Sequence, residues 1–306
     1  MFLKIVFAFI RILDEIIFVR FLNYDNYFKL HQFLGFPLIR LLFYKSHGYA
    51  LNLSNPSSFN EKLVCDKIKN RRKLYPIITD KFKVRSYVED KIGGDYLIPL
   101  LGAYDNINIE ILKSLDCKYI LKTNHGSHQH FIVNDLDNVN YAEMVEKSNQ
   151  WLAEKYRYQA LVWFAQEIPR KIIIEKLMLD KDGKVPFDYK FFIFNGKVEF
   201  IQVDADRFSG HHRILYTSNW DKLNVDYLVD SGGKAVDRPL NLEKMIQLAE
   251  KLGEDFEFMR VDLYDLEGDI FFGELTPYPS AGYGPISPVS YDFELGNKIE
   301  AQVKYE

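Results

Sequence analysis

The amino-acid sequence predicts an α+β fold with mostly antiparallel sheets. Segments with helical spacing dominate before residue 160, whereas short apolar segments typical of strands follow from residue 172 onward. Tight-turn signals at Asn195-Gly196 and around Gly268 join neighbouring strand segments directly, which requires antiparallel pairing. The length of 306 residues suits one large domain or two coupled ones and is sufficient for a substantial core.

The composition excludes several classes of protein. With 47% apolar and 27% charged residues, the chain is not disordered. A net charge of −4 provides no basic field, so we expect no nucleic-acid partner. Cys65 and Cys117 are too few for a disulfide framework and suit a reducing compartment, so we expect a cytoplasmic protein. Aromatic residues make up 15% of the chain, which fits sugar-stacking surfaces or, as we favour, an aromatic core.

Residues 1–50 are predicted to form a separate, apolar and helical segment. Its apolar stretches are shorter than the roughly 18–20 residues of a spanning helix, and it has no signal-peptide cleavage site. Charged residues interrupt the first stretch: Lys4, Arg11, Asp14, Glu15 and Arg20. As helices, these residues present a broad apolar face. That face either packs on the main body or docks peripherally at the inner face of a membrane through residues 1–45, and both alternatives stay open.

The next elements are predicted in chain order. The capping box Ser58-x-x-Glu61 opens a helix, and Thr79 or Asp80 begins another helix that ends at Gly93-Gly94. Apolar patterns then predict a strand at 99–104, two strands at 119–123 and 131–133 that flank a loop, a helix over 142–158 and a strand at 172–179.

The remaining elements are predicted as two hairpins and a helix. Strands are expected at 189–194, 198–203, 258–264 and 270–275, and a helix at 242–252. A two-residue turn fixes the register of the first hairpin, so one face is expected to be a core of Tyr189, Phe191, Ile193, Val198 and Phe200. The opposite face carries Asp188 and Lys190. Such a lysine is usually a surface residue unless an anion partners it.

The second hairpin is expected to bring two carboxylates together. Alternation places Arg260 and Asp262 on the face opposite the core, and a turn centred on Gly268 places Glu274 across from Asp262. Two carboxylates that face each other across paired strands, roughly 5 Å apart, repel each other unless a cation lies between them. Mg²⁺, completed by water and a substrate phosphate, meets that need, and so does the guanidinium of Arg260. The pattern leaves both open.

A third candidate feature is the loop that follows Lys122. A lysine that ends a buried strand, followed by Gly126 and Ser127, is suited to hold a nucleotide's phosphates, although a plain turn has the same pattern. Three histidines, His125, His128 and His130, also raise the question of a transition metal. Because the run contains no cysteine or acidic ligand, whether these histidines bind substrate or metal stays open.

Seven short motifs occur in order along the chain. They are Asn55-Pro-x-x-Phe59-Asn60-Glu61-Lys62-Leu63, Asp80-Lys81-x-x-Val84-Arg85, Lys122-x-Asn124-His125-Gly126-Ser127, Asp188-Tyr189-Lys190-Phe191, Asp204-x-Asp206-Arg207-Phe208, Arg260-Val-Asp262-Leu-Tyr264 and Gly273-Glu274-Leu275-Thr276. Together they resemble the TupA-like branch of the ATP-grasp superfamily, found in bacterial capsule, teichuronopeptide and O-antigen biosynthesis. The resemblance begins near residue 55 and leaves residues 1–50 outside.

The resemblance implies an ATP-grasp fold, in which two α+β lobes hold ATP between them. It divides residues 51–306 into parts at about 51–118, 119–180 and 181–306. It also implies Mg²⁺ as a second cofactor, with Asp262 and Glu274 as its ligands. The other implied roles are ATP contacts from Lys122, Ser127, Glu175 and Lys190, a substrate site at His125, Asp204, Asp206 and His212, and catalytic roles for Arg207, Arg213 and Arg260.

The activity that the resemblance implies is an ATP-dependent carboxylate–amine ligase, which joins an amino acid or amine to a uronic acid of a glycan or its precursor through an acyl phosphate. Two residues depart from the pattern: Thr276 stands where Asn is common, and His128 where Gly is common. Whether one or two Mg²⁺ ions bind stays open. So do two other functions, a glycosyltransferase-like enzyme that grips a nucleotide-sugar through Asp204-Ala205-Asp206, and a non-catalytic nucleotide-binding partner.

Overall fold

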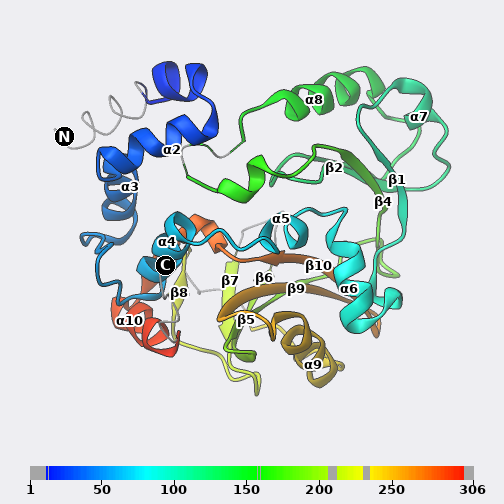
Figure 1. Cartoon of the computed structure of the whole chain (residues 1–306). Coiled ribbons are helices and arrows are strands. Elements are labelled where there is room, and N and C mark those ends of the chain that lie inside the picture. The colour runs from blue at the N-terminus through cyan, green and yellow to red at the C-terminus, as the bar shows by residue number, and fades with distance from the viewer. Residues whose placement is uncertain are drawn as a thin grey trace.

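Two antiparallel sheets form the framework of the protein. The computed structural model describes residues 12, 14–156, 158, 160–205, 212–229 and 235–299. The strands are β1 (Leu100–Tyr104), β2 (Tyr119–Thr123), β3 (His130–Val133), β4 (Ile172–Lys176), β5 (Asp188–Phe194), β6 (Lys197–Ala205), β7 (His212–Tyr216), β8 (Asp226–Tyr227), β9 (Phe258–Leu266), β10 (Asp269–Thr276) and β11 (Ile286–Ser287). The two framework sheets have the strand orders β1-β4-β2-β3 and β10-β9-β5-β6-β7, and β11 pairs with β8 in a separate two-stranded sheet (Figure 1).

Helices flank the sheets. They are η1 (Asp14–Val19), α2 (Tyr24–Phe33), α3 (Pro37–His47), α4 (Phe59–Lys69), α5 (Tyr75–Ile78), α6 (Val84–Ile92), η2 (Gly94–Tyr96), α7 (Ile109–Lys113), α8 (Tyr141–Ala153), η3 (Trp163–Gln166), α9 (Leu242–Gly253), η4 (Pro279–Gly282) and α10 (Val289–Lys298). α8 packs on the four-stranded sheet, and α9 packs on the five-stranded sheet (Figure 1). The neighbouring strands of each sheet pair antiparallel, which confirms the predicted α+β class.

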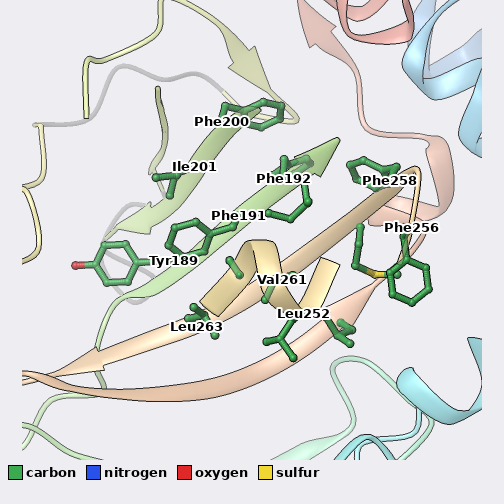
Figure 2. Close-up of a cluster of buried hydrophobic side chains, with 14 of the residues drawn as sticks. Tyr189, Phe191, Phe192, Phe200, Ile201, Leu252, Phe256, Phe258, Val261 and Leu263 are labelled. Atoms are coloured by element: carbon green, nitrogen blue, oxygen red, sulfur yellow. The ribbon is translucent and has the colours of Figure 1, made fainter. Parts of the chain in front are cut away.

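The main core lies between α9 and one face of the five-stranded sheet. The buried side chains of α9 recur at helical spacing and meet alternate residues of β5 and β9, including Phe191, Val261 and Leu263 (Figure 2). At the end of α9, a Cβ on Gly253 would lie 2.9 Å from Cγ2 of Ile193, so glycine allows the close approach of helix and strand. The aromatic residues therefore serve the core, as expected.

In the first hairpin, Phe200 lies on the face of the sheet opposite to the one predicted. The Asn195-Gly196 turn forms, with both residues at positive φ, and Ile193 pairs with Val198. The register then shifts, so that Phe200 pairs with Phe192 and their rings stack at 4.2 Å. A one-residue bulge moves every following side chain to the opposite face. The prediction that Phe200 shares a face with Phe191 is therefore wrong.

Two helix ends also differ from the prediction. The capping box of Ser58 and Glu61 is confirmed at the start of α4. The helix expected to begin at Thr79 or Asp80 begins instead at Val84. The Asp80 carboxylate accepts hydrogen bonds from the backbone N–H of Phe82 and from the side chain of Asn124, so it organises a turn before the helix. The helix expected to reach residue 158 ends at Ala153.

The N-terminal segment is helical where the structure describes it. Tyr27 of α2 and Ile39 and Phe43 of α3 are fully buried in a cluster with Val64 and Ile68 of α4. Residues 1–11 and 13 lie outside the described residues. No helix in the described part of the chain is both long and apolar enough to cross a membrane.

Candidate active site

The candidate site occupies the face of the five-stranded sheet that lies opposite α9. Alternate residues of four strands point to this face, and their register aligns them in rows. Glu274 of β10 lies opposite Asp262 of β9, which lies opposite Lys190 of β5, which in turn lies opposite Gln202 of β6. The predicted pairing of Asp262 with Glu274 is therefore confirmed.

A bulge in β10 produces this pairing. The turn residues Glu267 and Gly268 both have positive φ, of 54° and 105°, and set Asp269 opposite Leu266. Continued without a shift, that register would place Glu274 on the other face. The register instead shifts between Phe272 and Glu274. The extra residue there is Gly273, where a Cβ would lie only 3.1 Å from the carbonyl oxygen of Asp262.

Arg260 lies between the two carboxylates. Its Nε and Nη2 donate to the two carboxylate oxygens of Asp262, each at 2.7 Å. The same Nη2 donates to Oε1 of Glu274 at 2.5 Å and to Oγ1 of Thr276 at 3.0 Å. The Thr276 hydroxyl in turn donates to Glu274 at 2.9 Å. The guanidinium of Arg260 therefore bridges the two carboxylates.

Lys190 is buried among three carboxylates. Its Nζ donates to Asp188 and, at 3.1 Å, to Asp262, and it lies 3.7 Å from Asp204. Although burial opposes the charge, Asp188 and Asp262 raise the pKa of Lys190. Lys190 thus has the anionic partners that the sequence analysis required of a functional lysine, and its contact with a phosphate stays a prediction.

Charged groups of both signs lie close together on this face. Its described charged groups are four carboxylates and three cations: Asp188, Asp204, Asp262, Glu274, Lys190, Arg213 and Arg260. Burial, together with the charges of Asp188 and Glu274, raises the pKa of Asp262 to about 6 against the opposing Arg260. Partial burial opposes the ionisation of Glu274, yet Arg260 and the lysines Lys81 and Lys190 hold its pKa at about 2.

Gln202 and Arg213 surround Asp204 at the other end of the row. The Asp204 carboxylate accepts from Nε of Arg213 at 2.8 Å and from Nε2 of Gln202 at 2.9 Å. Although burial opposes ionisation, Arg213 and Lys190 lower the pKa of Asp204 to about 2. The Oε1 atom of Gln202 is buried without a hydrogen-bond partner. Three other predicted groups lie outside the described residues, namely Asp206, Arg207 and the side chain of His212.

A second charged cluster lies on the four-stranded sheet. Lys122 of β2 places Nζ 2.6 Å from Oε2 of Glu175 of β4, and Nη1 of Arg85 lies 3.5 Å from Oε1 of the same carboxylate. Glu175 is buried, whereas the side chain of Lys122 is 21% exposed. The structure thus brings together two of the residues for which ATP contacts were predicted.

The loop after β2 links this charged cluster, through Lys81, to the face of the five-stranded sheet that carries the candidate site, called here the polar face. Lys81 donates from Nζ to the carbonyl oxygen of Gly126 at 2.6 Å, and its charge also acts on Glu274. Ser127 is bonded to the hydroxyl of Tyr156 at 2.8 Å. Burial, aided by Arg170 and Lys81, lowers the pKa of His125 to about 4, so its imidazole is neutral at physiological pH. Its Nε2 is buried without a partner.

The other two histidines have different surroundings. His130 lies on β3 opposite Lys122. His128 has a φ of 62°, the left-handed region that favours glycine. Within the described ranges, no three His, Cys, Asp or Glu side chains are grouped so that they could hold a metal ion by themselves.

Three residues of the site were not assigned a role from the sequence. Asp188 and Gln202 share a face with Lys190. Alternation along β5 was a sufficient signal for Asp188, whereas Gln202 reaches this face only because of the bulge after Val198. Lys81 had no such signal, because its contact with Gly126 joins residues 45 positions apart.

Comparison with known proteins decides the family. A family model described as TupA-like ATPgrasp matches residues 61–300. The chain belongs to the TupA-like ATP-grasp family. Its fold is accordingly the ATP-grasp fold that the resemblance implied, and the polar face and the Lys122 loop belong to this TupA-like ATP-grasp region. No curated protein has a sequence that matches this chain.

Several solved structures are similar to this TupA-like chain. One is D-alanine–D-alanine ligase from Bacillus anthracis complexed with ATP, at 16% identity and a TM-score of 0.40, over 66% of this chain and 54% of that chain. Another is the ATP-grasp ligase PsnB with a precursor variant, Mg and ADP, at 12% identity and a TM-score of 0.37, over 68% of this chain and 53% of that chain. A third is N5-carboxyaminoimidazole synthase from Aspergillus clavatus with ADP, at 16% identity and a TM-score of 0.38, over 67% of this chain and 46% of that chain. The chain spans about half the length of each.

Proposed function

We propose that this protein is an ATP- and Mg²⁺-dependent carboxylate–amine ligase. The observation that carries the proposal is the row formed by Glu274, Asp262 and Lys190, in which two carboxylates and a lysine lie side by side on one face of an ATP-grasp sheet. Such a row offers oxygen ligands to a hard cation and a positive charge to a phosphate.

The residues of the row fit Mg²⁺. Both acidic side chains offer only oxygen donors, which Mg²⁺ prefers, and two carboxylates leave its other positions to water and phosphate. Burial is the main cause of the raised pKa of Asp262, so a cation that binds the ionised carboxylate would offset the cost of its desolvation. When bound, Mg²⁺ would neutralise charge on the phosphates of ATP. In this proposal Asp262 and Glu274 hold the ion, and Arg260 moves from them toward the transferred phosphoryl group.

The nucleotide is proposed to contact the Lys122 loop. Lys122 and Ser127 would bind phosphate oxygens, and Glu175 would lie near the base or ribose. The ion pair of Lys122 with Glu175 supports this assignment, because it holds a partly exposed ammonium on β2 before any phosphate arrives. Lys190 would contact a phosphate from the opposite sheet.

The proposed reaction has two steps. An oxygen of the acceptor carboxylate attacks the γ-phosphorus of ATP, which forms an acyl phosphate and releases ADP. The nitrogen of an amine then attacks the acyl carbon, phosphate leaves, and the nitrogen loses a proton to give the amide. Arg213 is positioned to bind a carboxylate, since its guanidinium is already held by Asp204. Asp206, Arg207, His212 and His125 are proposed to complete the substrate site.

We further propose that the acceptor is a uronic acid of a bacterial surface polysaccharide or its precursor, and that the amine is an amino acid or a simple amine. The glycosyltransferase alternative gains no support from Asp204-Ala205-Asp206, since Asp204 is buried and bonded to Arg213 and Gln202. The non-catalytic alternative is distinguished by turnover.

The test is release of ADP from Mg·ATP with pooled amino acids and uronic acids. We expect release that requires an acid and an amine together, and its loss in Glu274→Ala. A matched control is Asp269→Asn, an exposed carboxylate at the start of the same strand, which should keep full activity. Adenine-nucleotide binding without ADP release under any acceptor would support the non-catalytic partner instead. Full activity of Glu274→Ala would refute the metal assignment.

A further inference from the structure

We infer that the outer face of α2 and α3 docks the protein on an anionic lipid bilayer. Five of the thirteen exposed large hydrophobic side chains of the described residues lie within the first 44 positions: Ile12, Phe21, Phe33, Leu34 and Tyr44. Phe33 and Phe21 are 87% and 75% exposed, far more than a phenylalanine that belongs to a core. The inference does not depend on the proposed ligase activity.

The two helices have distinct inner and outer faces. Tyr27 and His31 of α2 are buried one turn apart. At about 100° per residue, Lys29 and Phe33 lie on the opposite side of the helix. In α3 the buried Phe43 is followed by exposed Tyr44 and Lys45. One face thus packs on the body, and the other presents aromatic rings beside lysines. α2 and α3 lie at the edge of the molecule, away from both sheets (Figure 1).

The outer face is held in place by polar contacts, of which those of Asp14 are buried. The Asp14 carboxylate accepts from the Tyr27 hydroxyl at 2.9 Å and is bonded to Nε2 of His31 at 2.8 Å. Lys155 donates to the carbonyl oxygens of Val19, Arg20 and Leu22 at 2.8, 3.1 and 3.1 Å, which fixes the turn that carries Phe21. The aromatic side chains therefore project from a preformed surface.

Charge identifies the partner. Residues 1–50 contain six Lys and Arg and three Asp and Glu, a net charge of +3. The rest of the chain contains 33 Lys and Arg and 40 Asp and Glu, a net charge of −7. One of those three acids, Asp14, is buried. Aromatic side chains interleaved with cations are typical of helices that lie in the interface of anionic membranes. The sequence of residues 1–11 continues the pattern, since it combines eight large apolar residues with Lys4 and Arg11.

The test is co-sedimentation of the full-length protein with vesicles of phosphatidylglycerol and phosphatidylethanolamine, compared with vesicles of phosphatidylcholine alone. We expect binding to the anionic vesicles only, with a loss of about tenfold or more in Phe21→Ser/Phe33→Ser. Lys29→Glu/Lys45→Glu should lose about twenty-fivefold or more, the product of two roughly fivefold losses for two surface cations.

Matched controls come from the same chain. Ile132→Ser/Leu240→Ser alters two exposed hydrophobic side chains elsewhere, and Lys181→Glu/Lys184→Glu reverses two exposed lysines elsewhere. Both should bind vesicles as the wild type does. Equal binding to neutral vesicles, or unchanged binding in the N-terminal variants, would overturn the inference. A self-association of the chain that Phe21→Ser/Phe33→Ser abolishes would also overturn it, because a second copy would then cover this face. ADP release without vesicles, measured in parallel, separates this result from the ligase proposal.

Discussion

Replacement of Arg260 by methionine tests the electrostatic balance of the site. Arg260 makes two hydrogen bonds to Asp262 and one to Glu274, whose side chains are 3% and 38% exposed. Without the guanidinium, Asp262 retains Lys190 at 3.1 Å, and two carboxylates face each other without a bridging cation. Removal of one partner of a buried ion pair costs about 3–5 kcal/mol. Because solvent screens Glu274, we expect the lower end of that range.

A loss of about 3 kcal/mol corresponds to a Tm that is lower by roughly 5 °C for a chain of this size. Mg²⁺ should restore part of it, since an ion at fifty times its Kd contributes about 2 kcal/mol. The wild type should gain less from Mg²⁺, because there Arg260 competes with the ion for the same oxygens. Differential scanning fluorimetry with MgCl₂, and with NaCl at equal ionic strength, measures both effects.

The double variant Arg260→Met/Glu274→Gln provides the control. With one carboxylate neutralised, it should be less destabilised than the sum of the two single variants, because the repulsion between the acids is gone. Equal Tm shifts with MgCl₂ and NaCl, or the same Mg²⁺ response in Arg260→Met and the wild type, would refute the reasoning.

Three other changes test separate parts of the site. Lys122→Ala should weaken ATP binding in a calorimetric titration while the fold persists, since Glu175 keeps Arg85; unchanged affinity would remove Lys122 from the nucleotide site. Mg²⁺ should promote nucleotide binding less as the pH falls through about 6, because a proton on Asp262, whose pKa burial raises, competes with the ion; equal enhancement at about pH 5 and about pH 7.5 would contradict this. His128→Gly should raise the free energy of unfolding by up to about 1 kcal/mol in urea titrations by relieving a positive φ, whereas Ser127→Gly should lower it.

The pairing of Asp262 with Glu274 in the candidate site could be predicted from the sequence, but not all of the residues that surround the pair. Turn chemistry and strand alternation are local properties, and the pairing of Asp262 with Glu274 was predicted from them on the assumption of a turn centred on Gly268. The turn is instead Glu267–Gly268, and the bulge at Gly273 restores the predicted pairing. The misplaced Phe200 shows the limit of the same reasoning, because the bulge after Val198 has no glycine to signal it. The bulge in β10 coincides with Gly273, a residue that allows close backbone approach.

Contacts between distant segments were not predictable from these local patterns. The approach of Lys81 to Gly126, and of Lys155 to the carbonyl oxygens before α2, depends on how the helical segments pack on the sheets. Nothing in the spacing of either lysine indicates its partner. The same holds for the beginning of α6, which follows from the capture of the Asp80 carboxylate by Asn124, 44 residues away.

The choice between Mg²⁺ and Arg260 as the cation between Asp262 and Glu274 would be exclusive only if Arg260 fully stabilised both ionised carboxylates. Arg260 bridges the pair, yet burial still raises the pKa of Asp262 to about 6. Because the arginine side chain is flexible, it can turn toward another anion when a divalent cation binds the pair. In our proposal, the guanidinium that bridges Asp262 and Glu274 would therefore become available to a phosphoryl group when Mg·ATP binds.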